Sequence, residues 1–195
     1  MSLHVAPIVL LGKEVRLEPL GPVHAQGLYN RGRVEKDWAH LPRSCFVDLA
    51  DTRHWIDEAL GAQGQLPFAI VETVKDRVIG STRYLNIMPQ HRSLEIGWTW
   101  LGQNWQRTAI NTEAKLLLLT HAFEKLGCVR VEFKTDARNE RSQRALQRIG
   151  AIKEGVLRNH MIVQDDFVRD SVYFSVISDE WLDIKKRLKR LGKRP

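Results

Sequence analysis

The chain has 195 residues, of which 43% are hydrophobic and 27% charged, and its formal net charge is +7. This composition fits one globular domain with a sizeable core and argues against a disordered or fibrous chain. No apolar run approaches the roughly 18 residues of a membrane span, and the N-terminus lacks a basic segment followed by a cleavage site, so we expect neither insertion nor secretion. The separated cysteines, Cys45 and Cys128, form neither a disulfide framework nor a zinc pattern, which favours a cytoplasmic location.

The hydrophobic periodicity predicts alternating strands and helices. The expected elements are a strand over 14–20, helices over 22–32 and 52–62, strands over 68–71, 77–84 and 94–100, a helix over 112–126, a strand over 129–135, a helix over 140–149, strands over 156–163 and 171–177, and a closing helix within 179–195. This order, β-α-α-β-β-β-α-β-α-β-β before the closing helix, predicts a mixed α/β fold. We expect a central sheet of about seven strands, with parallel crossovers only around the 112–126 helix. No linker or repeat divides residues 1–195.

Two of these elements allow more detailed expectations. The 52–62 helix is expected to be capped by Asp51 or Thr52, with its apolar residues Trp55, Ile56 and Leu60 on one face. In the 94–100 strand, strict alternation would place Leu94, Ile96, Trp98 and Trp100 on one face. Gly97 is unfavourable inside a strand and therefore indicates a bulge or a close backbone approach.

The closing helix concentrates positive charge. Residues 179–195 contain seven Lys or Arg and three acids, so four of the seven net positive charges lie there. Its residues Trp181, Ile184, Leu188 and Leu191 recur at helical spacing, which predicts an amphipathic helix with basic outer faces. Nucleic-acid binding through 185–194 is the alternative; we favour the amphipathic helix, because its apolar stripe requires a core.

A polar loop over residues 106–111 joins the 94–100 strand to the leucine-rich helix. A helix N-terminus presents unpaired N–H groups and the positive end of the helix dipole, so this loop suits a phosphate group. The alternative is an ordinary loop in which Asn111 caps the helix.

The order of elements, with this loop after the fourth strand, resembles the GNAT N-acetyltransferases and, within them, the ribosomal-protein alanine acetyltransferase (RimJ/RimL-like) branch. The similar motifs, spread over about residues 10–180, are Glu95-Ile96-Gly97-Trp98, Gln106-Arg107-Thr108-Ala109-Ile110-Asn111 in place of Q/R-x-x-G-x-G/A, Asn139-x-x-Ser142 before Gly150-Ala151, Glu154-Gly155-x-Leu157-Arg158, and Arg169-Asp170. The resemblance implies acetyl transfer from acetyl-CoA to a primary amine by direct attack, the acceptor being a protein N-terminus or a small molecule. We lean towards a peptide acceptor, because residues 33–50 lack the acid-rich stretch that a cationic small molecule would need.

The resemblance also implies roles for particular residues. Main-chain groups of Thr99, Trp100 and Leu101 would contact the pantetheine arm, and Asn139 and Ser142 would lie beside it. The pyrophosphate would be held by Gln106, Arg107, Thr108, Ala109, Ile110 and Asn111. The position of the Tyr that protonates the leaving thiolate in many family members is Leu146 here, so the branch resemblance implies Ser142 as its replacement. The alternative for Asn139 is a helix cap alone, and we favour a double role as cap and pantetheine contact; Ser142 can equally be a surface or capping residue.

Glu95 is the preferred general base, because a strand carboxylate near Gly97 can accept a proton from the amine through water. The alternative is a solvent-facing Glu paired with Lys or Arg. His160 and Asp170 are weaker candidates for the general base. Trp38, Trp100 and Trp105 are candidates for lining an acceptor pocket.

No cluster of residues has metal-ligand spacing. A CoA-binding module without turnover is the rival function, motivated by the missing Tyr and the glycine-poor loop, and homodimer formation is left open.

Overall fold

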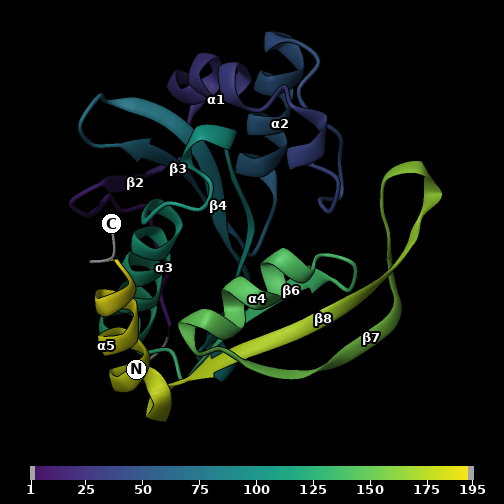
Figure 1. Ribbon diagram of the computed structural model, residues 1–195. Coiled ribbons are helices and arrows are strands. Elements are labelled where there is room, and N and C mark those ends of the chain that lie inside the picture. The colour runs from purple at the N-terminus through teal and green to yellow at the C-terminus, as the bar shows by residue number, and fades with distance from the viewer. Residues whose placement is uncertain (1–2, 193–195) are drawn as a thin grey trace.

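The computed structural model describes residues 3–192, which form one eight-stranded sheet covered by helices (Figure 1). The strands are β1 (Leu10–Leu11), β2 (Val15–Pro19), β3 (Leu66–Glu72), β4 (Arg77–Met88), β5 (Ser93–Leu101), β6 (Arg130–Asp136), β7 (Ile152–Ile162) and β8 (Val168–Ile177). The α-helices of this described part are α1 (Ala25–Arg31), α2 (Leu49–Gly61), α3 (Ile110–Thr120), α4 (Glu140–Ile149) and α5 (Trp181–Leu191). The mixed α/β class is confirmed, and the short β1 is the strand that the sequence pattern did not reveal.

The helices bury two separate cores, one on each face of the sheet. Residues of α3, α4 and α5 pack with the sheet in the larger core, and residues of α1 and α2 pack with it in the smaller one. Figure 1 shows α1 and α2 at the top, away from α3, α4 and α5. The apolar stripe of α5 is buried at Trp181, Ile184 and Leu188, as expected; residues 193–195 lie outside the described part.

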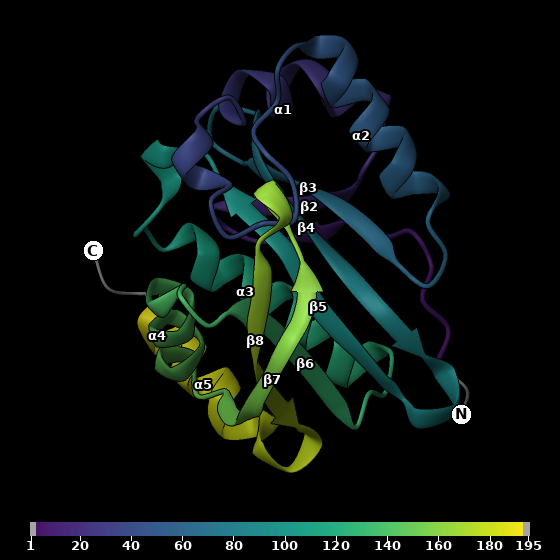
Figure 2. The ribbon, with the colours of Figure 1, turned by 90° about the vertical axis from the view of Figure 1, so that its right-hand side faces the viewer.

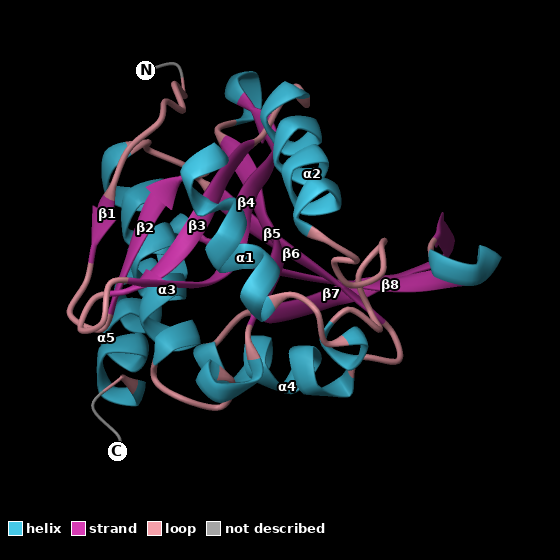
Figure 3. Cartoon of the chain, turned by 90° about the horizontal axis from the view of Figure 1, so that it is seen from above, coloured by secondary structure: helices cyan, strands magenta, loops and turns pink. Residues whose placement is uncertain are grey.

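The strand order is β1-β2-β3-β4-β5-β6-β8-β7, and Figure 3 shows β1 to β5 side by side in this order. Every neighbouring pair is antiparallel except β5 and β6, which are parallel and joined through α3, as predicted. Their pairing covers only Ser93–Glu95 against Arg130–Glu132. Beyond Glu95 the two strands therefore have unpaired facing edges, and the sheet opens at its centre.

A bulge in β5 lies at this opening. Arg83 of β4 pairs with Gly97 and Ser81 pairs with Trp100, so β5 has one residue more than β4 between these pairs. The bulge lies at Trp98, whose backbone takes a positive φ of 49°. The expectation that Trp100 shares a face with Leu94 and Ile96 was wrong, because the bulge turns Trp100 into the smaller core while the other two stay in the larger one.

Three helices depart from the expected bounds. α1 begins at Ala25 after a 3-10 turn, α3 ends at Thr120 and continues as a π-helix over His121–Lys125, and α2 and α3 begin earlier than expected. α2 begins at Leu49 with Asp48 as its cap, not Asp51 or Thr52, and Leu60 is 48% exposed while Ala59 is buried in its place. α3 begins at Ile110 with no side-chain cap, so Asn111 lies inside its first turn. The predicted cap of α4, Asn139, is confirmed: its Oδ1 accepts from Ser142 N at 3.0 Å.

The Asp48 cap gives a stability prediction. Its Oδ1 accepts from Asp51 N at 2.7 Å, so Asp48→Ala leaves a helix-end donor without its partner. We expect a loss of about 1 kcal/mol and a fall in Tm of about 2–4 °C, measured by thermal unfolding. Asp57→Ala, at an exposed position of the same helix, is the control; equal effects from both variants would contradict the cap.

Candidate active site

A cavity of about 610 Å³ lies where β5 and β6 diverge. We call its two parts the helix end, formed by residues 106–111 with the first turns of α3 and α4, and the hairpin end, formed by His40, Leu41, Glu95, Lys134, Met161 and Arg169. Most of the predicted site residues line this cavity: Glu95, Thr99, Trp100, Leu101, Gln106, Arg107, Thr108, Asn111, Asn139 and Ser142. Ala109 and Ile110 do not line it, and Ile110 belongs to the core.

The helix end presents a row of unpaired main-chain donors. The first hydrogen bond of α3 runs from Glu113 N to Ala109 O at 2.9 Å. Within residues 3–192 the N–H groups of residues 107, 108, 109, 111 and 112 have no acceptor, whereas Ile110 N donates to Thr108 Oγ1 at 3.3 Å. The loop has no glycine and obtains its turn from Arg107, whose φ is 61°. Such a set of N–H groups at a helix N-terminus can bind an anion.

The side chain of Gln106 holds this loop in place through hydrogen bonds to three other segments. Its Nε2 donates to Asp37 Oδ1 and to Leu101 O, each at 2.8 Å, and its Oε1 accepts from Arg141 Nη1 at 2.8 Å. Its own N–H bonds Gln103 O at 3.1 Å. Gln106 thus ties the loop to the 33–48 segment, to β5 and to α4, and its donors are already used.

The middle of the cavity is bounded by β5 and by α4. The edge of β5 that faces β6 has no partner strand after Glu95, which leaves main-chain groups around Thr99 to pair with an extended ligand, although Leu101 O already accepts from Gln106 Nε2. On α4, Asn139 uses its Oδ1 as the helix cap, so its Nδ2 remains as a donor to the cavity. Ser142 Oγ has no hydrogen-bond partner within residues 3–192, and Leu146 also lines the wall.

Glu95 lies at the hairpin end and is 1% exposed, so the solvent-facing position of the alternative is wrong, whereas its pairing with a Lys is present at Lys134. Its Oε2 accepts from Asn86 Nδ2 at 2.8 Å and lies 3.4 Å from Lys134 Nζ. Its Oε1 has no hydrogen-bond partner within the described residues. One carboxylate oxygen is therefore anchored and the other is available to accept a proton.

Gly97 provides the space for that free oxygen. A Cβ at this position would lie 2.9 Å from Glu95 Oε1 and 2.7 Å from Leu85 Cδ1. We expect Gly97→Ala to displace the carboxylate and to lower kcat by about tenfold or more, with a stability loss of about 1–3 kcal/mol from overpacking. Steady-state kinetics and thermal unfolding measure the two effects. Gly155→Ala, where a Cβ would meet nothing within 4 Å, is the control, and unchanged kcat in Gly97→Ala would refute the displacement.

Lys115 is a cavity residue that the sequence reading missed. It lies one turn after Asn111 on α3, is 7% exposed, and its Nζ donates to Thr99 Oγ1 at 3.0 Å. Thr99 Oγ1 also bonds Thr82 Oγ1 at 2.8 Å. Burial lowers the pKa of Lys115 to about 8, because no carboxylate offsets the loss of water. In the sequence it resembled any lysine of an amphipathic helix.

His40 and Arg169 line the hairpin end, and the buried Asp136, which does not line the cavity, lies close enough for its charge to act on both. Burial is the main cause that lowers the pKa of His40, and the charges of Arg138, Arg141 and Arg169 act in the same direction. Burial acts to raise the pKa of Asp136, but hydrogen bonds from Arg138 hold it below its ordinary value. None of the three was predicted as a site residue, because they come from a loop and two strands that only the folded chain brings together.

The wall formed by residues 33–48 is fixed by the tip of the β7–β8 hairpin. Gln164 Nε2 contacts the carbonyl oxygens of Trp38, Leu41 and Arg43 at 2.9, 2.8 and 2.6 Å. Figure 2 shows the hairpin rising to this segment. Of the tryptophans considered for an acceptor pocket, Trp100 lines the cavity, whereas Trp38 and Trp105 are core residues; Trp98 lines it as well.

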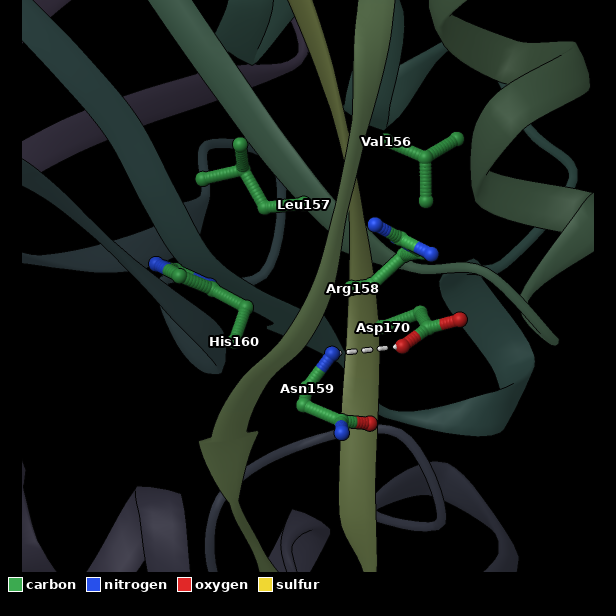
Figure 4. A pocket seen from close by; sticks show the side chains of 6 residues that line it. All are labelled: Val156, Leu157, Arg158, Asn159, His160 and Asp170. Atoms are coloured by element: carbon green, nitrogen blue, oxygen red, sulfur yellow. Dashed lines mark hydrogen bonds between the residues drawn. The ribbon is translucent and has the colours of Figure 1, made fainter.

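The weaker candidates His160 and Asp170 lie in a separate hollow on the hairpin (Figure 4). Asp170 Oδ1 accepts from Asn159 N at 2.7 Å, and His160 Nδ1 lies 3.0 Å from Ser171 Oγ. Neither side chain lines the main cavity.

Within residues 3–192 there is no cluster of His, Cys, Asp and Glu suited to a metal ion. The same residues contain no helix that is long and apolar enough to cross a membrane.

Comparison with known proteins identifies the family to which this cavity belongs. Residues 14–152 match the family described as acetyltransferase (GNAT) domain, Acetyltransf_3. The chain therefore belongs to the GNAT acetyltransferases, which confirms the resemblance seen in the sequence. The fold of this family binds CoA or acetyl-CoA as co-substrate.

Individual relatives agree with this assignment. A Bacillus subtilis (strain 168) protein named "Putative ribosomal N-acetyltransferase YdaF" is 34% identical over 96 residues, which cover 49% of this chain; the chain spans about half (51%) of the length of that curated relative. The solved GCN5-related N-acetyltransferase from Brucella melitensis is 30% identical, with a TM-score of 0.91 over 95% of this chain and 86% of that one. The spermidine N-acetyltransferase from Vibrio cholerae, solved with CoA and spermine, is 13% identical with a TM-score of 0.72 over 88% of this chain and 99% of that one, and shares the fold alone.

Proposed function

We propose that this chain transfers the acetyl group of acetyl-CoA to a primary amine by direct attack. The observation that carries the proposal is the cavity itself, in which unpaired N–H groups at the helix end are connected, through the gap between β5 and β6, to the Glu95 carboxylate. The two ends suit a pyrophosphate and a reacting amine, and the free edge of β5 suits the pantetheine arm between them. Membership of the GNAT family supports the same reaction.

The main-chain donors of residues 107–109, 111 and 112 are assigned to the pyrophosphate, with Gln106 as the brace that shapes their loop. Thr99, Trp100 and Leu101 are assigned to the pantetheine arm through their main chain. Asn139 donates to the same arm through Nδ2. This arrangement positions the thioester beside the bulge of β5.

In the reaction, the amine nitrogen bonds to the thioester carbonyl carbon and the carbon–sulfur bond breaks. Glu95 Oε1 accepts the proton that the amine loses, directly or through one water. Ser142 Oγ is assigned to hydrogen-bond the leaving thiolate in place of the absent Tyr. Cys45 and Cys128 do not line the cavity, and burial raises the pKa of the Cys128 thiol to about 11, which favours direct attack over a cysteine-bound acyl group.

Two measurements test the function against its rival. Acetyl-CoA is expected to raise Tm, because a ligand that binds only the folded state stabilises it. A panel of amines and peptide N-termini is expected to release free CoA thiol with at least one acceptor. Absence of a Tm shift at millimolar acetyl-CoA would contradict cofactor binding, and a shift without thiol release would favour a CoA-binding module without turnover.

A further inference from the structure

The hairpin end contains a buried guanidinium that forms no ion pair within residues 3–192. Arg169, on β8, is 4% exposed. Its Nε donates to Ser171 Oγ at 3.0 Å and its Nη1 to the carbonyl oxygen of His40 at 3.5 Å. Its Nη2 has no acceptor in this described part, although the side chain lines the cavity. Burial is the main cause that lowers the pKa of Arg169.

The acids of this end are already committed to other cations. Glu95 Oε2 lies 3.4 Å from Lys134 Nζ. Asp136 accepts from Arg138 through both oxygens, from N at 2.8 Å, Nε at 3.0 Å and Nη2 at 2.7 Å. The charges of Asp136 and Glu95 also act on Arg169, but each acid is paired with its own cation, so one positive charge among these five groups remains in excess.

The remaining titratable neighbour does not alter this balance. Burial is the main cause that lowers the pKa of His40, against the opposing charge of Asp136, and an imidazole supplies no negative charge to Arg169. A buried cation that lacks a counter-charge is unfavourable unless an anion binds beside it. The hairpin end therefore has the charge of a site for one carboxylate.

Arg169 is also held rigidly for binding. Ser171 Oγ, which accepts from Arg169 Nε, lies 3.0 Å from His160 Nδ1. The carbonyl oxygen of His40 belongs to the wall that Gln164 fixes. A guanidinium held in this way loses little conformational entropy when an anion binds.

We propose that Arg169 binds a carboxylate that the acceptor carries next to its reacting amine. The proposal rests on the acetyl transfer proposed above and specifies the acceptor class: a free α-amino acid, or a peptide whose first residue is Asp or Glu. A charge-assisted hydrogen bond from Nη2 would place the amine towards Glu95, which lines the same end of the cavity. The excess positive charge also disfavours polycationic acceptors and helps to keep the acceptor amine unprotonated.

The test compares acceptors with and without this charge, and kcat/KM is expressed per unprotonated amine, because a neighbouring carboxylate also raises the pKa of the amine. The wild-type protein is assayed for thiol release with alanine against alaninamide, and with peptides that begin with Asp or Glu against those that begin with Asn or Gln. We expect kcat/KM to favour the carboxylate member of one pair by about tenfold or more, mainly through KM, as one charge-assisted hydrogen bond predicts. The pair that shows the preference identifies a free amino acid or an acidic N-terminus as the source.

Variants then assign the preference to Arg169. Arg169→Gln is expected to reduce the ratio of the pair to about one, and Arg169→Lys is expected to retain part of the preference. Arg158→Gln, in the separate hollow of the hairpin, is the control and should leave the ratio unchanged.

Each contrary result has its own meaning. Equal kcat/KM for both members of every pair in the wild-type protein, which requires no variant to fold, would overturn the assignment of Arg169 and leave acetyl transfer standing. A preference that persists in Arg169→Gln would overturn it as well. Absence of thiol release with every acceptor would instead overturn the proposed function and, with it, this inference.

Discussion

Glu95→Gln is expected to lower kcat by about 10²–10⁴-fold, the range typical of a lost general base. The amide keeps the shape of the side chain but cannot accept the amine proton. The deficit should be largest at low pH, where nearly all of the acceptor amine is protonated, and should shrink as pH rises and the free amine becomes abundant. Thiol release measured across pH with a saturating acceptor gives the profile.

The cofactor end should be unaffected by this change, so acetyl-CoA should raise the Tm of Glu95→Gln as it does that of the wild type. Glu132→Gln is the matched control, because Glu132 is a strand carboxylate that bonds Arg130 Nε at 2.7 Å and does not line the cavity. A kcat within about threefold of wild type in Glu95→Gln would remove Glu95 from the role of base.

Lys115→Met is expected to stabilise the protein at pH 7 by up to about 3 kcal/mol. The pKa of Lys115 falls from 10.5 to about 8 on burial, so the unfolded chain binds this proton more tightly than the folded chain does. The folded state is therefore penalised in full below about pH 8. The penalty fades as pH rises to about 10.5, because the lysine is then neutral in both states.

Denaturant unfolding of both proteins at pH 7 and pH 10 measures this difference. The gap in free energy of unfolding between Lys115→Met and wild type should be large at pH 7 and small at pH 10. Lys189→Met, at an exposed position of α5, is the control and should show little gap at either pH. A Lys115→Met protein that is less stable than wild type at pH 7 would show that the Thr99 contact outweighs the cost of burying the charge.

Local sequence signals predicted most of the fold because they reflect local physics. α4 was predicted with both ends because an Asn cap and a Gly at φ 103° act within one turn of the helix. Capping was misassigned at α2, where Asp48, Asp51 and Thr52 all have suitable side chains and only the backbone geometry distinguishes them. The face of Trp100 was mispredicted because a bulge at Trp98 reverses the alternation after it.

By itself, the sequence determined the α/β order, the loop before α3, the Asn139 cap and the family, since each depends on residues that are close together along the chain. Three features were decided by the tertiary structure alone. Glu95 is buried with one carboxylate oxygen hydrogen-bonded, Lys115 is buried with no carboxylate paired to it in the described residues, and Arg169 donates to the carbonyl oxygen of His40. The environment of a charged group depends on its neighbours in space. In this protein those neighbours come from the 33–48 segment, β4, β5, β6, α3 and β8, which meet where the sheet opens.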